Sequence, residues 1–202
     1  MVSRKDYTAE AVAACKSVLV VALDFRNIPD ATYQSILRTF ASRGYRQDAD
    51  QPFRFYRTVS PPRGPRVEVE VDLLAGEYGG TGPGHRTQRV QDARARKARG
   101  CDLVFSNHES VEVEALLPEG GLDRVTCRVA GLVPWLVMKG MALHDRTKEK
   151  DAYDIYYVLR YSRGGAAALA EAFRPHLTEP LVTEGLGKIR SKFRTVEHLG
   201  PK

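Results

Sequence analysis

The first two-thirds of the chain contain short apolar runs, whereas the last third contains longer segments in which apolar residues recur at helical spacing. A valine-rich run over residues 16–25, KSVLVVALDF, predicts a buried strand. Apolar residues then recur at helical spacing within 30–44, where Asp30 is a suitable N-cap and Gly44 a suitable stop. The alternating run at 53–59 predicts a second strand.

The clearest alternation lies in RVEVEVDLL, residues 66–74, which follows the turn sequence SPPRGP and predicts a hairpin with the strand before it. Alternate side chains of a strand point to opposite faces, so one face is apolar and the other carries Glu68, Glu70 and Asp72. Three carboxylates on one face suit Mg²⁺ and, through it, a nucleotide phosphate. They equally suit a solvated face balanced by arginines of a neighbouring strand. Both interpretations stay open.

A glycine-rich segment and four further elements follow. Residues 76–84, GEYGGTGPG, predict a loop, and no Gly-Lys-Ser/Thr of a phosphate-binding loop follows it. The arginines between residues 86 and 99 predict a helix whose basic side chains suit either solvent or an RNA backbone. Runs at 101–105, 110–117 and 123–131 predict strands. The last two predict a hairpin with acidic side chains facing basic ones, as on the polar side of a sheet with one solvated face.

From residue 132 onward the apolar spacing is that of helices. Helices are predicted over 133–146, 150–162, 165–174 and 180–194. Together these elements predict an α+β fold, a mixed sheet with flanking helices and a helical C-terminal part. We expect an α+β core over residues 1–130 and a helical part over 131–202 that packs on it.

The composition is that of a globular protein, with 43% hydrophobic and 28% charged residues among 202. No apolar stretch reaches the ~18 residues of a membrane span. The first residues lack the pattern of a signal peptide, so we expect a cytoplasmic protein without a membrane partner. Cys15, Cys101 and Cys127 form no CxxC pair, and neither they nor the five histidines have zinc-ligand spacing. We therefore expect buried, reduced thiols.

The net charge of +6 comes with an excess of arginine, which accounts for 22 of the 31 basic residues. The planar guanidinium matches phosphate oxygens better than an ammonium group does. The balance therefore permits a nucleotide or nucleic-acid partner. A genome rich in arginine codons would equally produce such an excess of arginine.

Candidate chemistry concentrates in WLVMKGMALHDRTKEKDAYDIYYVL, residues 135–159. On a helix, Lys139 and Arg146 lie two turns apart on one face. Asp151 and Asp154 share a face of the next helix, where Lys150 can pair with Asp154. These residues suit an anion-binding lysine with an acidic partner in one cleft. They suit equally well a set of ion pairs that holds two helices together.

The stretch KGMALHDRTKEKDAYDIYYVL resembles the C-terminal motif region of the nucleotidyltransferase AbiEii/AbiGii toxin family. Members typically carry a lysine, a later arginine and then Lys-Asp-x-x-Asp-Ile or a similar sequence. Less specifically, VEVDLL resembles the later acidic strand of the family, and ALDFRN resembles the strand–helix unit before it. The resemblance covers roughly residues 18–160, and its specific part is 139–155.

The resemblance implies a nucleotidyltransferase-like fold and, in active members, the use of NTP and Mg²⁺, in some cases on the 3′ end of tRNA. Lys139 would contact the nucleotide phosphates, with Arg146 as a second binding residue. Asp154, or less favourably Asp151, would be the acidic residue of the last motif. Asp72 would be the third carboxylate, near the attacking hydroxyl. The implied partners are a nucleotide, tRNA or another RNA, and an antitoxin protein.

The chain departs from the family at its first motif. Family enzymes carry Gly-Ser and then Asp-x-Asp on the first strand, whereas the corresponding run here holds only Asp24. We therefore expect a nucleotidyltransferase-fold protein that is truncated or degenerate at its metal-binding end and that binds NTP, RNA or both. One alternative is an active Mg²⁺-dependent transferase that acts on tRNA, with Asp24 and Asp72 as metal ligands. The other is a non-catalytic interaction module.

Overall fold

The structure, a computed structural model, describes residues 17–28, 35–60, 65–77, 86–117 and 120–201. The chain divides into two compact units. The first unit holds the described residues within Met1–Ala75, Gly82–Arg96 and Ala115–Asp123, and the second those within Gly76–Thr81, Lys97–Glu114 and Arg124–Lys202. Strands predominate before residue 131 and helices after it, which confirms the α+β class. The predicted division after residue 130 stays a prediction.

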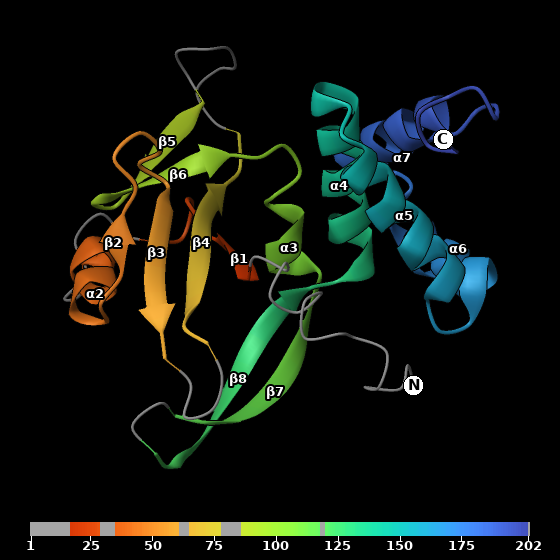
Figure 1. The fold of residues 1–202 in the computed structure, drawn as a ribbon. Helices are drawn as coiled ribbons and strands as arrows, with labels where there is room; N and C mark the ends of the chain where they lie inside the picture. The colour runs from red at the N-terminus through yellow and green to blue at the C-terminus, as the bar shows by residue number, and fades with distance from the viewer. Residues whose placement is uncertain (1–16, 29–34, 61–64, 78–85, 118–119, 202) are drawn as a thin grey trace. The chain divides into compact units, whose positions relative to one another are not determined.

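Among the described residues, the segments between Ser17 and Lys97 form a mixed, six-stranded sheet (Figure 1). Its main path runs β2-β3-β4-β6-β5, and β1 pairs with β4 outside this path. The β1–β4 pair is parallel, whereas β2–β3, β3–β4 and β5–β6 are antiparallel. The strands are β1 (Ser17–Ala22), β2 (Arg46–Gln47), β3 (Arg54–Val59), β4 (Val67–Ala75), β5 (Thr87–Val90) and β6 (Ala93–Lys97).

The alternation of β4 is confirmed, and it builds the core of the first unit. Val71 and Leu73 are buried on the apolar face, beside Phe55 of β3. The helix α2 (Ile36–Ser42) covers this cluster, and the Phe40 ring centre lies 4.6 Å from that of Phe55. The sequence pattern thus predicts the strand and its buried apolar residues, but Asp72 on the opposite face is buried as well.

The helix α2 starts and stops by local signals. The Ser35 hydroxyl caps its N-terminus by accepting a hydrogen bond from the Arg38 backbone N–H. Asp30, the predicted cap, lies outside the described residues. Gly44 follows the helix with φ of 74°, a left-handed conformation that glycine adopts without steric cost, so the predicted stop is confirmed.

The strand predicted at 16–25 is present as β1, but the prediction that it is buried is wrong. Leu19, Val20 and Val21 are 56%, 57% and 40% exposed. Among the described residues, β1 pairs with β4 alone and has no strand on its second edge. A valine-rich run indicates an extended conformation, but it does not tell which faces other elements will cover.

The helix predicted over residues 86–99 is also wrong, because the segment forms the hairpin β5–β6. Val90, Ala93 and Ala95 are buried, whereas the arginines between them are exposed. This period of two is the signature of a strand. Gln91 makes the tight turn with φ of 57°.

The strand predicted at 101–105 is wrong as well. The chain forms a single helical turn there, α3 (Leu103–Ser106), after Gly100 with φ of 85°. Residues 101–105 are too few for their apolar spacing to distinguish a helix from a strand.

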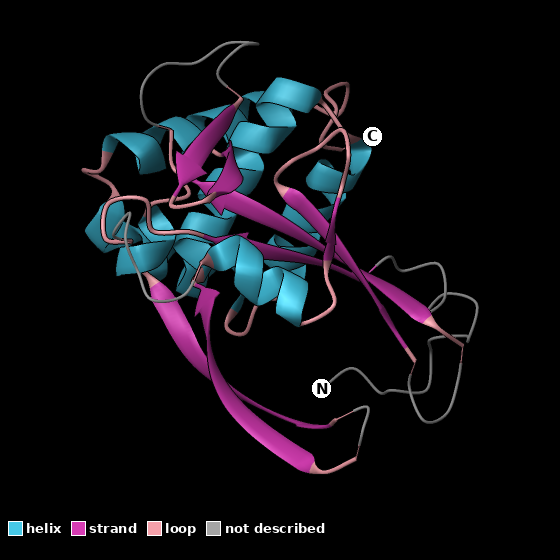
Figure 2. Ribbon diagram, turned by 90° about the vertical axis from the view of Figure 1, so that its left-hand side faces the viewer, coloured by secondary structure: helices cyan, strands magenta, loops and turns pink. Residues whose placement is uncertain are grey.

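Strands β7 (His108–Leu116) and β8 (Leu122–Ala130) form the second predicted hairpin as a separate two-stranded sheet (Figure 2). Gly131 donates to the Asn107 carbonyl at one end, and Leu117 donates to the Gly121 carbonyl at the other. Acidic and basic side chains do face each other, but the expectation of one solvated face is wrong. Every residue of the two strands except Ala130 is exposed, so both faces of the ribbon are open.

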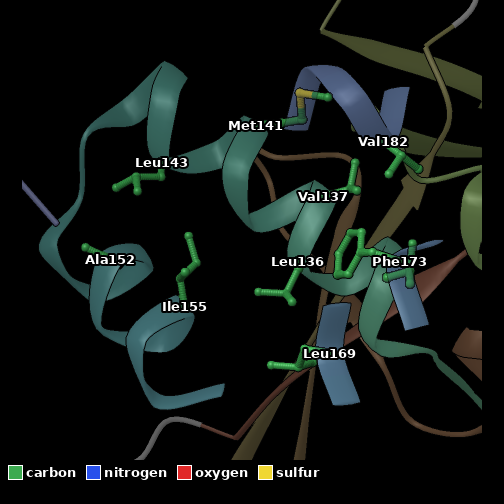
Figure 3. Close-up of a cluster of buried hydrophobic side chains, with 10 residues drawn as sticks. Leu136, Val137, Met141, Leu143, Ala152, Ile155, Leu169, Phe173 and Val182 are labelled. Atoms are coloured by element: carbon green, nitrogen blue, oxygen red, sulfur yellow. The ribbon is translucent and has the colours of Figure 1, made fainter. Parts of the chain in front are cut away.

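The four predicted C-terminal helices are confirmed to within two residues at each end. They lie in the second unit and share one core, to which all four contribute buried side chains (Figure 3). The helices are α4 (Leu132–Arg146), α5 (Glu149–Tyr161), α6 (Gly165–Phe173) and α7 (Pro180–Lys192), with a 3₁₀ turn at Arg174–His176. The core residues include Leu136, Val137, Leu143, Ile155, Leu169, Phe173 and Val182.

Two glycines allow α4 and α7 to approach closely. A Cβ on Gly140 would lie 2.6 Å from the Gly185 carbonyl oxygen, and a Cβ on Gly185 would lie 2.9 Å from Val137 Cα. Both distances are shorter than non-bonded atoms allow. Gly140, which follows Lys139 in the motif region, therefore has a packing role.

Candidate functional site

The residues singled out in the motif region come together between α4 and α5, and we call them the α4–α5 ion-pair cluster. Lys139 Nζ lies 2.6 Å from Asp154 Oδ2 and 3.2 Å from Asp151 Oδ1. Arg146 donates from Nε to Asp151 Oδ2 at 2.6 Å and from Nη2 to Oδ1 at 2.8 Å. Lys150 Nζ lies 3.2 Å from the same Asp154 oxygen as Lys139. These contacts are those of the ion-pair interpretation, whereas the anion-binding role of Lys139 stays a prediction.

A short connection between the helices creates this geometry. Helix α4 ends at Arg146, Thr147 adopts a left-handed conformation with φ of 46°, and Lys148 occupies the N-cap position of α5. The pair Arg146–Asp151 lies near this turn, and the pair Lys139–Asp154 lies farther from it. Across this contact Asp151 meets Lys139 and Arg146, which lie two turns apart on α4.

Asp151 is the buried member of the cluster, with a side chain only 2% exposed. Burial opposes its ionisation, but the hydrogen bonds from Arg146 and Lys139 outweigh burial and hold its pKa below the ordinary value. The same contact raises the pKa of Arg146. Both groups are therefore charged at neutral pH, and Asp151 joins α4 to α5.

The Lys139 side chain is more exposed to solvent than that of Asp151. Its side chain is 21% exposed, and its ammonium lies 5.5 Å from the centre of the Trp135 ring. A cation over an indole is attracted by the ring quadrupole, by about 0.5–1 kcal/mol near the surface. The sequence analysis missed Trp135, although its spacing of four residues from Lys139 on one helix is a signal for this contact.

The charges of the cluster do not cancel. Lys139, Arg146 and Lys150 supply three positive charges against the two negative charges of Asp151 and Asp154, which leaves one positive charge. An ammonium group has three N–H donors, of which Lys139 directs two at carboxylates. It can therefore bind an anion through the third, or by exchanging Asp154, which is 22% exposed, for a phosphate oxygen.

The acidic row of β4 lies in the first unit and is paired with arginines. Arg54 donates to both oxygens of Asp72, at 2.7 and 2.9 Å, and lies 2.9 Å from Glu70. Arg46 lies 2.7 Å from Glu68. The expected balance by arginines is therefore present, but the face is not solvated throughout, because Asp72 is buried.

The two aspartates expected to hold a metal ion both lie in the first unit but not at one level of the sheet. The parallel register places Val20 of β1 beside Asp72, so Asp24 lies four residues farther along. β1 ends at Ala22, so Asp24 lies beyond the end of the strand. Asp24 accepts a hydrogen bond from Asn27 at 2.8 Å. That Asp24 and Asp72 share a metal ion stays a prediction.

The structure places Asp72 in the first unit and Lys139, Arg146 and Asp154 in the second. Within the described part of the chain, no group of three or more His, Cys, Asp or Glu side chains is arranged to hold a metal ion. No helix among the described residues is long and apolar enough to cross a bilayer.

Another ion-pair group of the second unit was not expected from the sequence. Arg99 Nη2 lies 2.7 Å from Glu184 and its Nη1 lies 3.2 Å from Glu77, while Lys188 lies 3.0 Å from Glu184. The hydrogen bond from Arg99 is the largest influence on Glu184, whose pKa falls to about 2. Arg99 was expected in a basic helical face, but both of its partners are distant in sequence, and no spacing rule reveals them.

Comparisons with known proteins find no matching family model, no matching curated protein and no matching solved structure.

Proposed function

We propose that this chain is a nucleotidyltransferase-fold protein of the AbiEii-like type, degenerate at its metal-binding end, that binds NTP, RNA or both. The α4–α5 ion-pair cluster is the observation that carries the proposal. It brings Lys139 within hydrogen-bond distance of Asp151 and Asp154, which lie 12 and 15 residues away in the motif region on which the resemblance rests. It also keeps one uncompensated positive charge, which a phosphate can neutralise.

In this proposal, Lys139 binds a phosphate of the nucleotide. The ammonium exchanges its hydrogen bond to Asp154 for one to a phosphate oxygen, and Lys150, which is 81% exposed, remains to balance Asp154. Arg146 contributes positive charge nearby, while both of its bonds to Asp151 stay in place. The arginine pairs of the β4 carboxylates support binding that needs no metal ion.

Two other functions remain as alternatives. An active transferase would require Mg²⁺ and a tRNA acceptor, with Asp72 as a catalytic carboxylate. A non-catalytic interaction module would use the cluster only to join α4 to α5, and the two-point contact between Arg146 and buried Asp151 favours such a role for that pair. In each case the resemblance makes an antitoxin protein the proposed protein partner.

Isothermal titration of the protein with ATP, CTP, GTP and UTP separates these functions. We expect binding of at least one nucleotide that is equally tight in Mg²⁺ and in a chelator. Binding that requires Mg²⁺ would favour the active transferase instead. The absence of binding at millimolar nucleotide would favour the interaction module.

The variant Lys139→Ala tests the assigned contact. We expect nucleotide affinity to fall at least about tenfold, the equivalent of ~1.4 kcal/mol. Lys148→Ala is the matched control, because it removes a neighbouring exposed lysine charge that takes no part in the contacts of the cluster. It should change affinity by less than about threefold. Equal affinities of Lys139→Ala and the parent protein would remove Lys139 from the site.

A further inference from the structure

Helix α5 exposes an unusual row of aromatic residues, which we call the tyrosine face: Tyr153, Tyr156, Tyr157 and Tyr161. Their exposed fractions are 61%, 48%, 41% and 62%. Asp151, Ala152 and Ile155 are the buried residues of the same helix. The outer side of a surface helix is normally charged or polar, so four exposed rings on one short helix require a reason.

The four rings form a continuous chain along the helix. The ring centres are 6.5 Å apart for Tyr153–Tyr156, 6.2 Å for Tyr153–Tyr157 and 4.8 Å for Tyr157–Tyr161. The planes are tilted by 38° to 46° rather than stacked. These contacts hold the rings in place without covering them, so a planar ligand would meet an already ordered surface.

Positive charge accompanies the rings. The Arg160 guanidinium lies 5.8 Å from the centre of the Tyr161 ring. The exposed charged residues of 149–163 are Lys150, Arg160 and Arg163 against Glu149 alone, which gives a net charge of +2. A partner that fits this surface therefore carries negative charge and flat apolar faces together.

An unpaired nucleic-acid strand has both properties, because its bases stack on aromatic rings and its phosphates pair with nearby cations. A duplex lacks the first property, since its bases are already stacked on one another. We propose that the tyrosine face binds an unpaired strand of nucleic acid, with bases stacked on Tyr153 and Tyr161 and a phosphate beside Arg160. This inference rests on the RNA part of the function proposed above, but not on nucleotide binding at Lys139.

Fluorescence anisotropy with labelled oligouridylate and oligothymidylate of about 12 nucleotides tests the proposal, since site sizes of such surfaces are about 4–16 nucleotides. Tyr153→Ala with Tyr161→Ala should weaken binding at least about tenfold, because each stacked base contributes about fivefold or more. The matched pair Tyr153→Phe with Tyr161→Phe keeps both rings and should bind within about twofold of the parent protein. An RNA duplex of equal length should bind at least about tenfold more weakly.

Two controls separate stacking from charge and from misfolding. Arg190→Ala with Arg194→Ala removes two exposed positive charges from α7 or just beyond it, neither of which pairs with any described residue, and should weaken binding by less than about threefold. All variants alter exposed side chains, and thermal melts should show that each remains folded.

Several results would overturn the inference. They are equal loss in the alanine and phenylalanine pairs, a larger loss in the α7 pair than in the alanine pair, or equally tight binding of duplex. A dimer of the parent protein that the alanine pair dissociates, seen by sedimentation, would instead identify the tyrosine face as a contact between copies. If the parent protein binds no strand at all, the RNA part of the proposed function fails as well, whereas the nucleotide titration tests Lys139 independently.

Discussion

Arg146 and Asp151 form a two-point ion pair across the turn between α4 and α5, with both guanidinium–carboxylate distances below 3 Å. The Asp151 side chain is 2% exposed, whereas that of Arg146 is 40% exposed. The partly exposed Arg146 guanidinium thus compensates the charge of a carboxylate that is shielded from solvent. Such a pair costs little while intact, but it costs much when one partner is removed, because the other is then buried without compensation.

Removal of the arginine should therefore destabilise the protein. We expect Arg146→Ala to lower the free energy of unfolding by about 2 kcal/mol, less than the 3–5 kcal/mol of a fully buried pair because Lys139 still contacts Asp151. Urea denaturation followed by circular dichroism measures this change. Lys150→Ala, which removes an exposed partner of Asp154, should cost less than about 0.5 kcal/mol. A similar cost for the two variants would show that the burial of Asp151 has no energetic weight.

The contact between α4 and α7 gives a second prediction. Alanine normally stabilises a helix by about 1 kcal/mol relative to glycine. At Gly140 the added Cβ would lie 2.6 Å from the Gly185 carbonyl oxygen, so the helices must move apart. We expect Gly140→Ala to lower the free energy of unfolding by about 1–3 kcal/mol, the usual cost of overpacking, in urea denaturation.

Gly187 on the same helix as Gly185 provides the control. A Cβ at Gly187 would meet no atom within 4 Å, so Gly187→Ala should gain the intrinsic preference of alanine and raise stability by up to about 1 kcal/mol. Opposite signs for the two substitutions would support the close approach of α4 and α7. Stabilisation by both would contradict it.

These features mark the limit of what the sequence predicts. The periods of β4 and of the four C-terminal helices predict those elements from the sequence alone, but the burial of Asp72 on the polar face of β4 was not predicted. The helix predicted over residues 86–99 was wrong because its arginines suggested a basic helical face. Val90, Ala93 and Ala95 in fact alternate with these arginines, as in a strand. The period of two was present, but the charge of the segment outweighed it in the prediction.

The contacts of the candidate site were likewise predictable only in part. Residues at helical spacing on adjacent helices, such as Lys139 and Asp154, meet because a short turn joins the helices, so local rules suffice. The pairing of Arg54 with Asp72 depends on which strand lies beside β4, and the pairing of Arg99 with Glu184 spans 85 residues. Long-range partners of this kind follow from topology, and a single sequence contains no pattern that specifies them.

The Arg99–Glu184 pair predicts a pH dependence of stability. Its hydrogen bond, with help from Lys188, lowers the pKa of Glu184 from 4.5 to about 2. A carboxyl with a lower pKa in the folded state contributes stability that is complete above its unfolded pKa and is lost as pH falls through the folded pKa. This contribution is therefore present at pH 6 and lost between about pH 4.5 and pH 2. Partial exposure and salt reduce it to about 1 kcal/mol.

The substitution Glu184→Gln should remove this dependence. The loss of unfolding free energy between pH 6 and pH 2.5, measured in urea, should be about 1 kcal/mol smaller in the variant than in the parent protein. Glu171→Gln is the matched control, because Glu171 forms an exposed pair with Arg174 within one helical turn. Its pH dependence should equal that of the parent protein. Equal slopes for all three proteins would mean that Arg99 does not stabilise the charged form of Glu184.

The two described cysteines should differ sharply in reactivity. Burial, with a smaller contribution from Asp102, raises the pKa of Cys101 to about 12. Cys127 is exposed on β8, so the prediction of a buried thiol is wrong there. Because the thiolate is the nucleophile, iodoacetamide at pH 8 should alkylate Cys127 at least about 100-fold faster than Cys101 in the folded protein. Peptide mass mapping over time measures both rates, and in urea the two rates should converge. Comparable rates in the folded protein would contradict the burial of Cys101.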